Sequence, residues 1–201
     1  MRIRTLIVCV VAGFLTVGRP ARAVTNPATA PSHTASFESG HHAALSSGRR
    51  YSINFSDIDG RTLSIADDHV TVLVLTTTED LTRARAVADN VPDYCLGNEK
   101  YRMITVLRLT QLGRPVVMTF VRHRVDEEAK RLQTRYDAKK ISHPAREDIH
   151  VVTDFDGSIA AQLGAQSGET GFHVFVFGRA GELLQQWDDV PSAQELAAVV
   201  K

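Results

Sequence analysis

A nearly unbroken run of β-branched and aliphatic residues, VTVLVL at 70–75, is the feature that most constrains the fold of this chain. Such a run is typical of a strand that is covered on both faces of its sheet. Leu81, Ala84 and Ala88 follow with the spacing of one helix face. Pro92 ends this helix. A buried strand followed directly by an amphipathic helix indicates an α/β domain.

The rest of the chain from residue 49 adds two hairpins, two strands and three helices. The first hairpin turns at Asp59-Gly60, and the second pairs 172–177 with 182–187. The two strands cover 103–109 and 149–152. The helices cover 125–136, 158–163 and a last segment that opens with a capping box, SAQE at 192–195. Residues 110–121 fit strand, helix or loop. Strands that alternate with helices, then a hairpin and a terminal helix, predict a mixed β-sheet sandwiched by helices.

The first 23 residues have the pattern of a secretory signal peptide. Arg2 and Arg4 give a positive start, residues 6–17 form a short apolar run, and ARA at 21–23 is an A-x-A cleavage site. The run is too short to cross a bilayer, which takes about 20 helical residues. An uncleaved anchor is the alternative. We therefore predict a periplasmic or secreted protein, with no membrane integration after cleavage.

Cleavage after Ala23 changes both the charge and the cysteine count. The full chain has 23 basic and 23 acidic residues, and removal of four arginines and no acid leaves 19 against 23, a net charge of −4. This balance gives no excess of positive charge with which to bind nucleic acid. Cys9 is removed as well, so Cys95 stays as a single thiol that has no internal disulfide partner.

Residues 24–47 predict a flexible linker, because they are mostly Ala, Ser, Thr, Gly, Pro and His. His41 and His42 lie in it, and we predict no metal site there, since a bound metal needs further ligands nearby. Residues 48–201 are enough for one domain with a single core.

Four segments carry a resemblance to a known group of proteins. They are FSDIDGRTLSI at 55–65, VLVL at 72–75, VTDFDGSIAAQLG at 152–164 and FVFGRAGEL at 175–183. In this order they resemble the redoxin group, which covers thioredoxin-like thiol–disulfide proteins and the alkyl hydroperoxide reductase/thiol-specific antioxidant type. The similarity spans residues 50–201 and implies a thioredoxin-like fold.

The catalytic cysteines of that group have no counterpart in this sequence. The group's chemistry uses a thiol at the start of the first long helix, where the helix dipole stabilises a thiolate. The corresponding stretch at 75–83 is LTTTEDLTR, and TTTE at 76–79 instead has the pattern of a capping box. The cis-proline that the group carries nearby is replaced by Gly171-Phe172-His173. Ordinary thioredoxin or peroxiredoxin catalysis is therefore not expected.

The chain also resembles the YtfJ family, an exported, cysteine-free branch of thioredoxin-like proteins. The similar positions are Asp156-Gly157, 174–177, Gly181, Trp187 and 192–200. This resemblance implies an exported thioredoxin-like domain.

An intact order of elements without the cysteines predicts a non-catalytic module that binds an exported protein or peptide. Binding would use the surface at which the group's members take substrates. The residues expected there are Thr77, Thr78, Glu79, Asp80, Phe172 and His173. We expect no cofactor, and the sequence favours a protein without enzymatic activity over an enzyme.

Two alternatives from the enzyme class stay open. The first is a one-cysteine thiol oxidoreductase or peroxide-related redox protein, which would need Cys95 to be exposed, low in pKa and near a base. Cys95 follows a helix end, where the dipole disfavours a thiolate, so a structural cysteine or a disulfide between chains is the competing interpretation. The second is a small-molecule enzyme in which His173 acts with Glu79 or Asp80 as acid and base.

Overall fold

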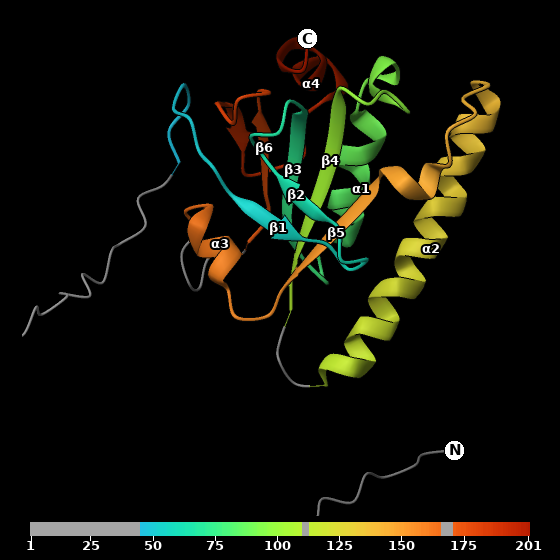
Figure 1. Ribbon diagram of the computed structural model, residues 1–201, viewed down its shortest axis with the longest axis horizontal. Coiled ribbons are helices and arrows are strands. Elements are labelled where there is room, and N and C mark those ends of the chain that lie inside the picture. The colour runs from blue at the N-terminus through green and yellow to red at the C-terminus, as the bar shows by residue number, and fades with distance from the viewer. Residues whose placement is uncertain (1–44, 110–112, 166–170) are drawn as a thin grey trace, which may run out of the picture. The chain divides into compact units, whose positions relative to one another are not determined.

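The computed structural model describes residues 45–109, 113–165 and 171–201 (Figure 1). The predicted signal peptide, residues 1–23, and residues 24–44 of the predicted linker lie outside these ranges. None of the described helices combines the length and the apolarity that a bilayer crossing requires.

A five-stranded mixed sheet forms the centre of the domain. Its strands are β3 (Val70–Thr77), β4 (Tyr101–Arg108), β5 (Ile149–Asp154), β6 (His173–Phe177) and β7 (Leu183–Trp187), in the spatial order β5-β4-β3-β6-β7. Strands β3, β4 and β5 are parallel, β6 is antiparallel to β3, and β7 is antiparallel to β6. The central strand β3 is buried at every residue except Thr77, as its sequence predicts.

Helices and a small hairpin surround this sheet. They are the hairpin of β1 (Asn54–Ser56) and β2 (Thr62–Ser64), the helices α1 (Leu81–Asn90), α2 (Arg114–Ala138), α3 (Ser158–Gln162) and α4 (Ala193–Val199), and the short 3₁₀ turns η1 (Asp93–Cys95) and η2 (Ala145–Asp148). The parallel β3–α1–β4 unit beside an antiparallel β6–β7 hairpin, closed by α4, is the thioredoxin-like arrangement that the resemblance implied. The predicted α/β fold class is confirmed.

The two faces of the sheet have different covers, because side chains alternate along β3. Val72 and Val74 pack with α1 and α4, together with Val87 and Leu196. Leu73 and Leu75, on the opposite face, pack with the β1–β2 hairpin and α3; their neighbours include Phe55, Ile65, Leu163 and Phe175. Helix α2 covers the β4–β5 part of the α1 face through Val121 and Val125, which contact Leu107, Ile149 and Val151.

Helix α2 is longer than the sequence indicates. The sequence predicts a helix only over 125–136, whereas α2 begins at Arg114. Gly113 precedes it with a φ of 73°, a left-handed conformation that suits glycine, and Pro115 lies in the first turn, where its missing N–H costs nothing. Residues 113–121 are thus resolved as the start of this helix, while 110–112 lie outside the described residues.

One of the two predicted capping boxes is confirmed and the other is wrong. At α4 the Ser192 hydroxyl accepts a bond from the Glu195 N–H (3.3 Å), and the Glu195 carboxylate accepts one from the Ser192 N–H (2.8 Å). Thr76, the first residue of the other box, lies inside β3, and α1 has Asp80 as its N-cap without a side-chain capping bond. Pairing of β3 with β4 continues to Thr77 opposite Arg108, so Thr76 is unable to cap a helix.

Candidate binding site

Two segments that are about 95 residues apart in sequence meet at one end of the sheet. In the antiparallel β3–β6 pair, Leu75 lies opposite His173. The loop that follows β3, residues 77–80, therefore lies beside the first residues of β6. These are the two segments from which the sequence predicts a binding surface.

The loop after β3 is a closed turn with two exposed residues at its tip. Thr78 and Glu79 are exposed, whereas Thr77 and Asp80 are half-buried. The Thr77 hydroxyl donates to the Asp80 carboxylate (3.4 Å), and the Asp80 carbonyl accepts the Arg83 N–H (2.9 Å). These bonds fix the direction in which the loop enters α1.

Arg83 in the first turn of α1 connects this loop to the segment that follows β7. Its guanidinium donates to the Asp80 carboxylate (3.2 Å), to the Asp188 carbonyl (3.1 Å) and to the Asp189 carboxylate (2.8 Å). The bond from Arg83 lowers the pKa of the Asp189 carboxyl, which therefore stays ionised. The guanidinium also lies over the ring of Phe172, 4.0 Å from its centroid.

Phe172 is buried below this guanidinium and retains only 1% of its surface exposure. It packs with Val174, Val176 and the apolar residues of α1 and α4. Phe172 can therefore support a binding surface through Arg83 but offers little area of its own to a partner.

His173 has an acidic partner, but not one of the two that the sequence suggests. Its Nδ1 lies 2.9 Å from the Asp188 carboxylate, across the β6–β7 hairpin. A carboxylate only accepts, so Nδ1 donates this bond. The Nε2 of His173 is buried, and no described residue bonds to it. The structure thus joins His173 to Asp188 instead of forming the predicted acid–base pair with Glu79 or Asp80.

Cys95 lies elsewhere, at the end of η1, and is the one cysteine among the described residues. It is 8% exposed and packs in the apolar cluster on the α1–α4 face. Burial raises the pKa of its thiol to about 11. A buried, protonated thiol lacks the exposure and the low pKa that the one-cysteine alternative requires.

Arg83, Asp188 and Asp189 are the site residues that the sequence analysis does not find. The position of Arg83, three residues after Asp80 on a predicted helix, is a signal that could have indicated an ion pair. The two aspartates come to the site only through the β6–β7 pairing. No group of three or more metal-ligating side chains is found in the described part of the chain.

No family model and no curated protein matches this chain. Solved structures with a similar fold include a secreted thiol-disulfide isomerase from Corynebacterium glutamicum, with 9% identity over 76% of this chain and 83% of that one and a TM-score of 0.49. The exposed lipoprotein thioredoxin of Streptococcus pneumoniae has 11% identity over 75% and 98% of the two chains, with a TM-score of 0.48. StoA from Bacillus subtilis has 15% identity over 77% and 99%, with a TM-score of 0.47. At these identities the likeness concerns the fold alone, and the resemblance to the YtfJ family stays a prediction.

Proposed function

We propose that this protein is an exported thioredoxin-like module that binds another exported protein or peptide without thiol catalysis. Binding uses the loop surface, which consists of Thr77, Thr78, Glu79, Asp80, Arg83 and His173. The observation that carries the proposal is the Leu75–His173 pairing, because it joins the loop to the start of β6 while the described cysteine is buried elsewhere. Export rests on the signal-peptide pattern of residues 1–23.

The charges around the loop surface favour a partner segment with positive charge. Arg83 bonds to Asp80, which follows the exposed Glu79 in the loop, and to Asp188 and Asp189 after β7. The side chains of Asp188 and Asp189 are 89% and 84% exposed. Four carboxylates against one guanidinium leave an acidic rim, which attracts a segment that contains Lys or Arg.

Site-specific photo-cross-linking tests this proposal without a known partner. A photoreactive residue is placed at position 78, at the exposed tip of the loop, and at position 99 as a matched control. Glu99 is also exposed but precedes β4, so it lies at the opposite end of the parallel strands. We expect discrete adducts with another exported polypeptide from position 78 and none of these adducts from position 99. Equal adduct patterns from both positions, or no adducts at all, would contradict the proposal.

A further inference from the structure

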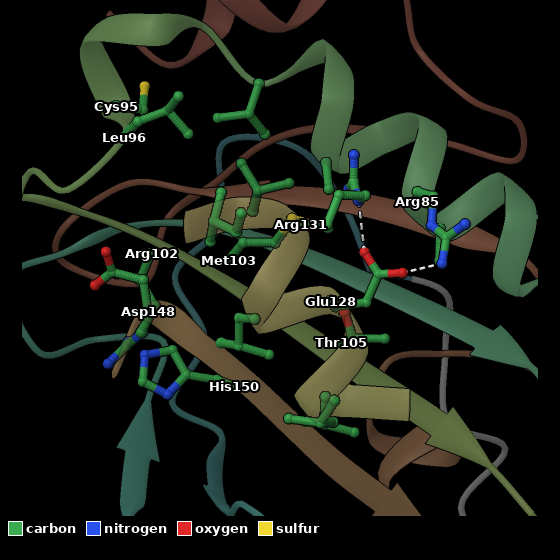
Figure 2. A pocket seen from close by; sticks show the side chains of 18 of the residues that line it. Arg85, Cys95, Leu96, Arg102, Met103, Thr105, Glu128, Arg131, Asp148 and His150 are labelled. Carbon is green, nitrogen blue, oxygen red and sulfur yellow. Dashed lines mark hydrogen bonds and ion pairs between the residues drawn. The ribbon is translucent and has the colours of Figure 1, made fainter. Parts of the chain in front are cut away.

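A cavity of about 300 Å³ lies between α1, α2 and the sheet, apart from the loop surface (Figure 2). Its floor is strand β4, its two walls are α1 and α2, and most of its lining is apolar. The floor consists of Met103, Thr105 and Leu107, the α1 wall of Ala84, Ala88 and Val91, and the α2 wall of Val121, Val125 and Leu132. Its volume falls at the lower end of the range of small-molecule pockets, roughly 300–1,000 Å³.

Charged side chains bridge the two helices over the cavity, and Leu81 at the start of α1 adds an apolar contact to the Val121 and Val125 cluster of α2. Glu128 of α2 bonds to Arg85 of α1, and it also accepts from Arg131 at 2.8 Å. Arg131 reaches back to Asp89 of α1 at 2.6 Å. Figure 2 shows Glu128 between Arg85 and Arg131, with Met103 and Thr105 on the β4 side of the cavity. The small side chains of Ala84 and Ala88 leave the space below these ion pairs unfilled.

The bridging charges are unequal in number. The ladder of ion pairs between α1, η1 and α2 contains Arg85, Arg131, Arg135 and Lys139 against Glu128, Asp89 and Asp93. Four cations against three carboxylates give this ladder a net charge of +1. Arg85 shares its one carboxylate, Glu128, with Arg131. Arg131 also pairs with Asp89, so a further carboxylate at this mouth would find Arg85 as the incompletely paired guanidinium.

We propose that the cavity binds a small amphipathic carboxylic acid. The aliphatic chain lies on Met103, Leu107 and Val125, and the carboxylate bonds to Arg85 at the mouth. The apolar lining and the small volume fit a medium-length chain, whereas a peptide helix would need both walls to separate and the ion pairs to break. This site goes beyond the proposed function and does not rest on it.

Calorimetric titration of the mature protein with decanoate tests the proposal. We expect one saturable site per chain and a concentration-dependent rise of the melting temperature. Decanol has the same chain without the charge, so it should bind about tenfold more weakly, which corresponds to one charge-assisted hydrogen bond. Equal affinity for decanol, or no binding of either compound, overturns the proposal.

Variants identify the site to which decanoate binds. Ala88→Phe and Val125→Trp fill the cavity from opposite walls and should abolish binding, with circular dichroism used to confirm that each variant folds. Arg85→Gln should reduce the affinity for decanoate about tenfold and leave that for decanol unchanged. Arg122→Gln is the matched control, because Arg122 is exposed on α2 and does not line the cavity. Unchanged decanoate binding in a folded cavity-filling variant, or in Arg85→Gln, also overturns the proposal.

Discussion

The guanidinium of Arg83 lies over the ring of Phe172, 4.0 Å from the ring centroid, and so couples the start of α1 to the start of β6. The same guanidinium bonds to Asp80 before α1 and to Asp189 after β7. One side chain therefore joins the segments that form the loop surface. In the redoxin group that the sequence resembles, a thiol stands in this region, whereas here the region is organised by an arginine.

Replacement of Arg83 by alanine should lower the free energy of unfolding by about 1 kcal/mol. The lost cation–π contact and ion pairs are worth only this much, because the side chain is 37% exposed and water screens its charges. Urea unfolding measures the change. Arg122→Ala, an exposed position on α2, should stay within about 0.5 kcal/mol of the wild type. Equal effects of the two substitutions would show that Arg83 does not organise the site.

The Cys95 thiol should react slowly with alkylating reagents at neutral pH and should titrate near its shifted pKa of about 11. Burial raises this pKa above that of the unfolded chain, so the native state holds its proton between about pH 9 and 11 while the unfolded state has lost it. The stability that Cys95 contributes is thus complete below pH 9 and is lost as the pH rises towards 11. Thermal unfolding across this range should show a smaller alkaline loss for Cys95→Ala. Fast alkylation with a pKa below about 8 would contradict this account.

Substitution of Gly181 by alanine should destabilise the protein far more than the same substitution at Gly60. Both glycines have a positive φ, 75° and 81°, so alanine at either position is destabilised by the backbone conformation by roughly 1 kcal/mol. A Cβ at Gly181 would lie 2.2 Å from the Tyr51 carbonyl oxygen, whereas a Cβ at Gly60 meets nothing within 4 Å. Urea unfolding of the two variants should differ by at least about 1 kcal/mol. Equal losses would mean that the β6–β7 turn does not contact the segment around Tyr51.

The sequence predicts the buried strands well and fails where tertiary pairing decides between local alternatives. TTTE at 76–79 and SAQE at 192–195 carry the same capping pattern, yet only the second caps a helix. Ser192 is free to turn towards α4, while Thr76 is held in the sheet by the parallel β3–β4 pairing. A local motif contains no information about a strand that is formed 30 residues later.

The candidate site also has a part that the sequence predicts and a part that depends on strand pairing. The two segments, 77–80 and 172–173, can be predicted because the order of elements places them at one end of the sheet. The aspartate beside His173 cannot be predicted from the sequence. Asp188 reaches His173 only through the register of the β6–β7 hairpin, in which Val174 pairs with Trp187. Phe172 is buried for the same reason, because alternation along β6 directs it towards α1. Register is fixed by the packing of both strands and is not visible in either one.

The most direct test of the central claim is the photo-cross-link from position 78 repeated in the Cys95→Ala background. Binding through the loop surface needs no thiol, so we predict the same adducts in the same yield as with Cys95 present. Cys95 is buried and is not one of the loop-surface residues, and the substitution removes the thiol without adding a polar group. Loss of the adducts in a folded Cys95→Ala protein would show that the thiol takes part in binding and would contradict the account.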